Sequence, residues 1–114
     1  MAECLFCAIV AGEIPAATVL ETDRILAFRD IDPQAPTHVL VIPKEHHPDL
    51  GALAAADSVL LGEVINGARR VAADEGVSET GYRVVFNTGG HAGQDVPHVH
   101  GHVLGGRSLA WPPG

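Results

Sequence analysis

Short apolar runs along the chain predict five β-strands. The runs are rich in β-branched residues and are bounded by residues that favour turns, a pattern typical of strands. They cover residues 18–21, 25–30, 38–42, 82–87 and 98–104. A tight turn at 22–24 joins the first two, and a proline stops the third because it cannot donate to a sheet ladder. We therefore expect a mostly antiparallel sheet of five strands.

A second periodicity predicts helices. Residues 49–76 are rich in Ala and Leu, and the apolar side chains from 61 to 72 recur at the three- and four-residue spacing of one face of a long helix, which Gly76 can end. Asp57 or Ser58 can cap this long helix. Its apolar stripe holds Leu61, Val64, Ile65, Ala68, Val71 and Ala72. A short helix over residues 5–11 precedes the sheet. Strands that flank one long helix predict an α+β fold.

Length and composition fit a single domain that spans residues 1–114. A chain of this length has room for one core, and 46% hydrophobic with 18% charged residues predicts a folded chain. No apolar run reaches the roughly 20 residues of a membrane helix, so we expect no membrane partner. The formal net charge of −7 disfavours a nucleic-acid partner, which requires a basic patch. Residues 1–4 lack the basic start of a secretory signal, so we expect a cytoplasmic protein.

Histidines at alternate positions distinguish the last predicted strand. His98, His100 and His102 share one face, because side chains along a strand alternate with a period of two. Val99 and Val103 then point to the opposite face, into the core. Adjacent imidazoles would each need a hydrogen-bond partner, so they are unusual as filler. A satisfied polar ladder and a histidine metal cluster are the alternatives to a catalytic role.

A glycine-rich loop leads into this strand. Residues 88–95 contain three glycines, which let the backbone come close to a ligand and turn N–H groups toward an anion. An ordinary mobile loop would have the same composition. Imidazole, with a reference pKa of about 6.5, is largely neutral and nucleophilic at pH 7, and a neighbouring imidazolium can stabilise phosphoryl oxygens. The loop and the histidines together therefore indicate phosphorus chemistry.

The two cysteines of the chain form a C-x-x-C pair, Cys4 and Cys7. A disulfide there would close a very short loop, contribute little stability and not persist in a reducing cytosol. Metal ligation is the more natural use, although it needs two further ligands from elsewhere in the chain. A pair of reduced thiols without metal is the alternative.

The segment 98–104 resembles the motif of the histidine triad (HIT) family, His-φ-His-φ-His-φ-φ, where φ is apolar. Other segments are similar to the Hint branch of that family, the purine nucleoside phosphoramidases. These segments are 26–31, 33–38, 41–44, 105–107 and the Trp-Pro-Pro-Gly tail at 111–114. The resemblance covers nearly the whole chain, and its most specific parts are the triad, the glycine-rich loop and the tail.

The resemblance implies a fold and an activity. The fold is an antiparallel sheet of five strands with a long helix, in which two subunits pair into a continuous sheet. The apolar stripe around residues 61–72 would lie at that homodimer interface, although its composition equally fits an ordinary core. The implied activity is hydrolysis of the P–N bond of AMP-amide or AMP-lysine substrates, through a covalent nucleotidyl-histidine intermediate and with no cofactor required for the chemistry.

The family motif implies a role for each site residue. His100 corresponds to the nucleophile, His102 would contact the α-phosphate, and His98 would support the site. Asp30 corresponds to the acceptor for both ribose hydroxyls, a role that suits a carboxylate. Positions around the phosphate and leaving group are Asn87, Gly93, Gln94 and Asp95. The apolar walls of a purine pocket are Phe6, Ile9, Phe28 and Ile31, for which core packing is the alternative.

Two positions depart from the family pattern. Gly101 stands where the motif has an apolar residue, which weakens packing behind the strand. Asp95 stands where a serine is usual near the leaving group, and its carboxylate would repel phosphate unless it is protonated or paired. We expect this carboxylate to lower the rate or to alter the leaving-group preference.

The resemblance also supplies ligands for a metal ion. His46 and His98 match positions that complete a Cys₂His₂ site with Cys4 and Cys7, which predicts one structural zinc ion per chain. The sequence leaves open whether His46 or the adjacent His47 is the ligand.

Two other functions remain open from the sequence. Asp95 favours a nucleotide- or zinc-binding interaction module that has lost catalysis. A dinucleoside polyphosphate hydrolase of the same family is the other alternative, although the short chain and its 111–114 tail count against it.

Overall fold

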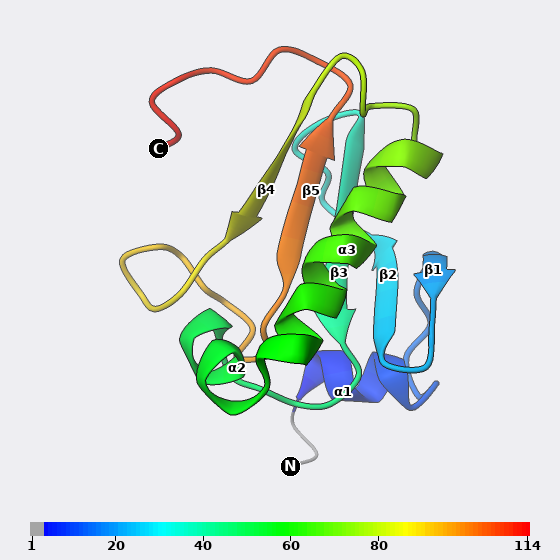
Figure 1. The fold of residues 1–114 in the computed structure, drawn as a ribbon, viewed down its shortest axis with the longest axis vertical. Coiled ribbons are helices and arrows are strands. Elements are labelled where there is room, and N and C mark those ends of the chain that lie inside the picture. Colours follow the sequence, from blue (N-terminus) through cyan, green and yellow to red (C-terminus); the bar gives the residue numbers. More distant parts are fainter. Residues whose placement is uncertain (1–3) are drawn as a thin grey trace.

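A computed structural model describes residues 4–114 and contains one antiparallel sheet of five strands. The strands are β1 (Thr18–Glu21), β2 (Ile25–Arg29), β3 (Thr37–Pro43), β4 (Tyr82–Phe86) and β5 (Gly101–Gly105). Their order is β1-β2-β3-β5-β4, so β5 lies between β3 and β4 (Figure 1). The expected α+β class and sheet are confirmed. Residues 1–3, to which the expectation about a secretory signal partly refers, lie outside the described range.

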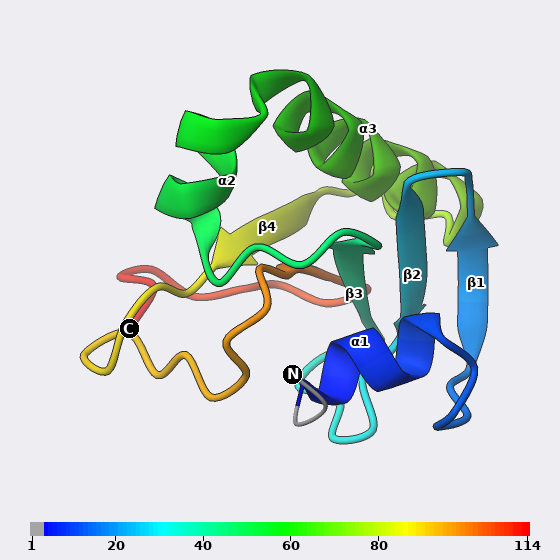
Figure 2. The ribbon, with the colours of Figure 1, turned by 90° about the horizontal axis from the view of Figure 1, so that it is seen from below.

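Helices cover both faces of the sheet. They are α1 (Leu5–Val10), α2 (Leu50–Ala56) and α3 (Ser58–Asp74). The long helix α3 crosses one face, and α1 lies against the other (Figure 2). Among residues 4–114, no helix combines the length and the apolar character that a membrane crossing requires.

Side-chain alternation along β3 divides the interior into two cores. Val39 and Val41 belong to the cluster that packs against α3. Leu40 and Ile42 belong to a second cluster, which includes Phe6 of α1. Every residue of β3 is buried, so this central strand supports both layers.

Asp57 separates α2 from the long helix α3. Its backbone is extended (φ −157°, ψ 85°), and its side chain accepts a hydrogen bond from the Leu60 N–H at 2.9 Å, which caps α3. The expected cap of the long helix is confirmed, whereas α2 is a helix that the sequence did not point to. The apolar stripe also differs from the prediction, since Leu60 is buried whereas Ile65 is 48% exposed.

Only part of the triad segment is a strand. β5 begins at Gly101, not at His98 as expected. Continuing the β3–β5 register beyond Gly101 would set Val99 opposite Pro43, which has no N–H to offer a ladder. Val99 instead donates its N–H to the His47 carbonyl at 2.8 Å. The lost ladder therefore has a local cause in β3.

The triad imidazoles nevertheless project to one side, as expected. The Phe6 ring of α1 makes edge contacts with the His98 and His100 rings, at 5.9 and 5.1 Å between centroids. The His102 ring lies 5.0 Å from that of His100. The two valines of the segment lie in the opposite core, against α3.

Gly101 leaves room for an aromatic ring from the neighbouring strand. It pairs with Phe86 of β4. A Cβ at position 101 would lie 2.8 and 3.0 Å from two atoms at the end of the Phe86 ring, which is too close for van der Waals contact. The Phe86 ring thus fills the space that an apolar side chain at 101 would take, and packing behind the strand is maintained.

We expect Gly101→Val to lower the free energy of unfolding by about 1–3 kcal/mol, because the added side chain overpacks against Phe86. The double variant that also carries Phe86→Leu should lose less free energy of unfolding than the sum of the losses in the two single variants, since leucine leaves room for the added side chain. Urea denaturation of the parent, both single variants and the double variant measures this coupling. Strictly additive costs would contradict the proposed contact.

Candidate active site

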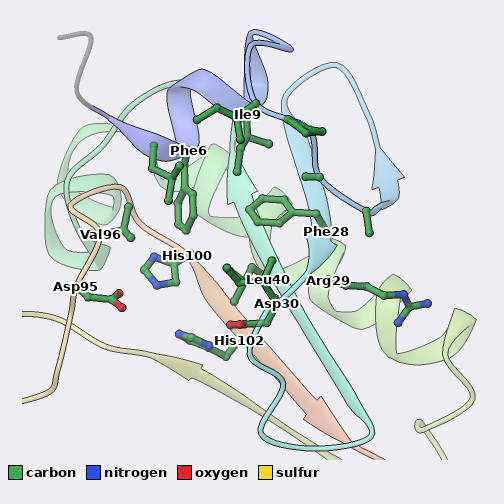
Figure 3. A pocket seen from close by; sticks show the side chains of 16 residues that line it. Phe6, Ile9, Phe28, Arg29, Asp30, Leu40, Asp95, Val96, His100 and His102 are labelled. Atoms are coloured by element: carbon green, nitrogen blue, oxygen red, sulfur yellow. The ribbon is translucent and has the colours of Figure 1, made fainter.

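A pocket of about 460 Å³ opens between α1, the sheet and the triad segment (Figure 3). The expected site residues that line it are Phe6, Ile9, Phe28, Asp30, Ile31, Asp95, His100 and His102. Residues that the sequence did not point to are Leu5, Ile14, Pro15, Ala16, Ala17, Arg29, Leu40 and Val96. Ile31 contributes only to the rim, because its side chain is fully exposed (101%). The pocket therefore joins an apolar end to an end with imidazoles and carboxylates.

His100 is held by a hydrogen bond to the backbone of its own segment. Its Nδ1–H donates to the carbonyl oxygen of His98 at 2.8 Å, and a carbonyl can only accept. The ring is 5% exposed and lines the pocket. In the neutral ring this bond leaves the lone pair on Nε2. His100 therefore has the tautomer and the fixed orientation of a nucleophile.

A histidine that the sequence did not point to, His38 of β3, orients His102. The Gln34 N–H donates to His38 Nδ1 at 3.0 Å, so the proton of the neutral ring lies on Nε2. His38 Nε2–H in turn donates to His102 Nδ1 at 2.9 Å. The neutral His102 ring then carries its own proton on Nε2, where it can donate to a ligand in the pocket.

Burial keeps these two rings uncharged near neutral pH. It lowers the pKa of His102 to about 4, with a smaller contribution from the neighbouring His100 and His38 rings, while Asp30 and Asp95 oppose the shift. Burial also lowers the pKa of His38, against the opposing charges of Asp30 and Asp32. Both rings thus act as neutral hydrogen-bonding groups.

Asp30 completes this group without making it a metal site. Its Oδ1 accepts from the Asp32 N–H at 2.8 Å, and its Oδ2 lies 3.4 Å from His38 Nε2. Asp30, His38 and His102 bring three potential ligand atoms within 4.8 Å of one another. However, His38 Nε2 already carries a proton shared with His102, so it has no lone pair for a metal ion. We interpret the group as a hydrogen-bonded chain.

The glycine-rich loop is braced by Gln94. Its Oε1 accepts from the Gly89 N–H at 3.1 Å, and its Nε2 donates to the carbonyls of Pro48 at 2.7 Å and Val96 at 3.1 Å. Gly93 has φ +81°, a conformation that favours glycine. Asn87, Gly93 and Gln94 do not line the pocket, whereas Asp95 does. The structure therefore gives Gln94 a role in holding the loop.

Four potential metal ligands converge beneath the triad segment, as the sequence predicts. They are Cys4, Cys7, His46 and His98, with ligand atoms that all lie within 4.8 Å of one another. The Sγ of Cys4 lies 3.4 Å from His98 Nδ1, and the Sγ of Cys7 lies 3.4 Å from His46 Nδ1. The two Nδ1 atoms are 3.3 Å apart. His47 is not part of the cluster, because its Nε2 bonds to Glu45 at 2.9 Å.

The cluster has the dimensions of a tetrahedral zinc site, and the His98 ring has the tautomer that such a site needs. Zinc bonds of about 2.3 Å to sulfur and 2.0–2.1 Å to nitrogen set neighbouring ligand atoms about 3.3–3.8 Å apart. His98 Nε2–H donates to the Pro43 carbonyl at 2.8 Å, which leaves the Nδ1 lone pair facing the cysteines. Burial and the adjacent Cys4 raise the pKa of Cys7 to about 11, a shift that a bound cation would reverse. These residues could therefore hold a metal ion.

The model of the HIT domain family matches residues 11–109 of the chain. The chain belongs to the HIT family. Purine nucleoside phosphoramidase of Escherichia coli K12 is 46% identical to it over 107 residues, which are 94% of this chain and 90% of that protein. A HIT-like protein of Synechocystis is 50% identical over 110 residues, 96% of each chain. The family expected from the triad motif is confirmed.

Two solved HIT structures have the same fold along nearly their whole length. A HIT family hydrolase from Legionella pneumophila superimposes with a TM-score of 0.95 at 54% identity, covering 98% of this chain and 100% of that one. A histidine triad protein from Clostridium difficile gives a TM-score of 0.92 at 39% identity, covering 96% of each chain. The order of helices and strands in this chain is therefore that of the HIT fold.

We expect the His102 ring of this HIT protein to remain neutral near pH 6.5, where a free imidazole titrates, and to take up a proton near pH 4. Because the unfolded chain binds this proton at higher pH, acidification from 6.5 toward 4 should destabilise the fold. Histidine NMR titration measures the midpoint. Asp30→Asn should lower it further, since the carboxylate favours the charged ring. A midpoint near 6.5 would contradict the burial argument.

Proposed function

We propose that this protein hydrolyses the phosphorus–nitrogen bond of purine nucleoside phosphoramidates, such as AMP amides and AMP-lysine. The observation that carries the proposal is the hydrogen bond that fixes the His100 ring with Nε2 free beside the pocket. The E. coli relative at 46% identity, which is named a purine nucleoside phosphoramidase, supports the same activity.

The proposed reaction has two displacements at phosphorus. In the first, His100 Nε2 forms a bond to phosphorus, the P–N bond breaks, and the amine leaves after gaining one proton. In the second, water adds to phosphorus and releases one proton to the solvent, which offsets the proton gained in the first step; the bond to His100 breaks, and AMP leaves with the ring restored. His102 Nε2–H would donate to an α-phosphate oxygen in both steps, a role supported by its bond to His38.

The nucleoside would occupy the apolar end of the pocket. Phe6 and Phe28, whose rings contact each other edge-on at 5.5 Å, would enclose the purine together with Ile9 and the exposed Ile31. Asp30 would accept hydrogen bonds from both ribose hydroxyls. Asn87 and Gly93 would lie near the phosphate, with Gln94 supporting them through the loop. The partner is thus a purine nucleotide.

We further propose one structural zinc ion per chain, held by Cys4, Cys7, His46 and His98. The ion would supply no step of the reaction and would cross-link the N-terminal helix to the triad segment. Support comes from the fit of the ligand atoms and from two free thiols, which a reducing cytoplasm would preserve. Because His98 also accepts the bond from His100, the ion would steady the nucleophile through the backbone.

A homodimer remains part of the proposal. Strand β4 forms one edge of the sheet, and its first residue, Tyr82, is 38% exposed. Ile65 of α3 is 48% exposed, which is unusual for a large apolar side chain on a helix that otherwise faces the core. Pairing two copies along β4 would extend the sheet and cover part of this surface.

The nucleophile is tested by replacing His100. We expect His100→Ala to reduce kcat on adenosine 5′-phosphoramidate by about a thousand-fold or more, because the covalent intermediate forms on the His100 ring that this variant lacks. Mass spectrometry of the quenched parent reaction should detect AMP on a peptide that contains residue 100.

The matched control is His91→Asn, since His91 is exposed in the neighbouring loop and does not line the pocket. Its activity should stay close to that of the parent. Parental activity in His100→Ala would overturn the proposed mechanism.

The zinc site is tested by elemental analysis. We expect one equivalent per chain in the parent, well under half an equivalent in Cys7→Ser, and a lower Tm in that variant because the cross-link is lost. His47→Asn should keep its zinc, since His47 bonds to Glu45 and not to the cluster. Less than half an equivalent in the parent would rule out the site.

A further inference from the structure

We propose that Asp95 selects the leaving group, favouring amines that carry positive charge and disfavouring groups that carry or develop negative charge. The inference rests on the phosphoramidase activity proposed above and names the class of substrate at the same site. It makes Asp95 a specificity-determining residue and assigns it a function that a serine at this position could not supply.

The first support is the position of Asp95. Figure 3 shows its carboxylate directed into the hollow that His100 and His102 also face, with Asp30 on the opposite side of the two imidazoles. The nucleoside end of the pocket, with Phe28, lies on the side of Asp30. A nucleotide seated there would direct the third substituent of its phosphorus toward Asp95.

The second support is the lack of a compensating charge. Within residues 4–114, Asp95 makes no ion pair and no side-chain hydrogen bond, whereas Asp30 accepts from a backbone N–H. Arg29, the one cationic side chain in the pocket lining, is held by Glu75 in two bonds of 2.8 and 2.9 Å. His102 is neutral near pH 7 because burial lowers its pKa. The Asp95 charge therefore acts directly on whatever enters this side of the site.

The chemistry of P–N cleavage gives this charge a use. The departing nitrogen must gain one proton, which water in the open pocket supplies, so the nitrogen carries developing positive charge from this protonation until the bond to phosphorus has broken. A carboxylate beside that atom stabilises the developing charge. An oxygen leaving group departs with negative charge instead, and the same carboxylate repels it. Asp95 thus favours P–N over P–O cleavage in two ways, because it attracts the positively charged nitrogen and repels the negatively charged oxygen.

The negative charge of Asp95 also acts on charged groups that lie further from the reacting nitrogen, along the leaving group. An amine with a second, cationic group would be attracted to the Asp95 side of the pocket, and one with a carboxylate would be repelled. A chain of phosphates would be repelled most strongly. The substrate class that fits best is therefore a purine nucleoside phosphoramidate of a cationic amine, such as a diamine, and not a dinucleoside polyphosphate.

A matched series of substrates tests the inference. Adenosine 5′-phosphoramidates of 1,4-diaminobutane, 4-aminobutanol and 4-aminobutyrate share the reacting nitrogen and differ in terminal charge. In the parent, kcat/KM should fall in that order, and the first substrate should exceed the last by about ten-fold or more. Added salt should reduce this difference in kcat/KM, because it screens the charges. In Asp95→Asn the three values should converge to within about three-fold, while Asp95→Glu should keep the parental order.

Two comparisons isolate the role of this one carboxylate. Asp74→Asn removes the same charge from the exposed end of α3 and should leave the parental order unchanged. The p-nitrophenyl ester of AMP, with an oxygen leaving group, should be cleaved relatively better by Asp95→Asn, so the P–N to P–O ratio of kcat/KM should fall. Equal changes on all substrates, or an unchanged order in Asp95→Asn, would overturn the inference.

Failure of the inference is distinguishable from failure of the proposed function. If the parent cleaves the phosphoramidates only when His100 is present, and Asp95→Asn keeps the order of the series, the phosphoramidase stands and the role of Asp95 is wrong. If the parent cleaves none of the phosphoramidates, the proposed function and this inference fall together. Circular dichroism of each variant confirms that a changed order does not reflect unfolding.

Discussion

The hydrogen bond from the His100 ring to the His98 carbonyl is the constraint on which the site depends. It fixes the ring, decides which nitrogen keeps its lone pair, and ends at the residue whose side chain belongs to the cysteine cluster. His98 thus has two roles: its ring belongs to the cluster, and its backbone carbonyl accepts the hydrogen bond from His100. The geometry of the His100 ring and that of the cysteine–histidine cluster are consequently linked through a single residue.

The sheet arranges the rest by simple alternation. One face of β3 packs against α3 and stabilises the fold, while the other face meets α1 and leaves room for a ligand. His38 and His102 lie on the second face, on neighbouring strands, which is why their rings can share a proton. The division separates structural residues from candidate functional ones, so each set can change with little effect on the other.

Features that depend on local periodicity can be predicted from the sequence, whereas features that depend on a distant partner cannot. The three triad rings project to one side of the segment because side chains alternate with a period of two. The hydrogen-bond ladder, in contrast, stops at Gly101 because of Pro43, a residue on another strand. His38 was missed because its meeting with His102 depends on the strand register. Asp57 was recognised as a possible cap of α3, whereas α2 was missed, because a helix of 7 residues is too short for a helical period to show clearly in the sequence. The cluster of Cys4 with His98 came from the family motif alone, since spacing along the chain does not specify contacts across it.

The distance along the chain between the cluster residues has a consequence for how the protein acquires its structure. Cys4 meets His98 across 94 positions of sequence, so this contact of the N-terminal segment cannot form until nearly all of the polypeptide has been synthesised. Contacts of such long range form late, because the entropy of closing the intervening chain must be overcome first. Because β5 (Gly101–Gly105) follows His98 in the chain and lies between β3 and β4, the complete sheet and the His100 side of the pocket would form together, at a late stage of folding.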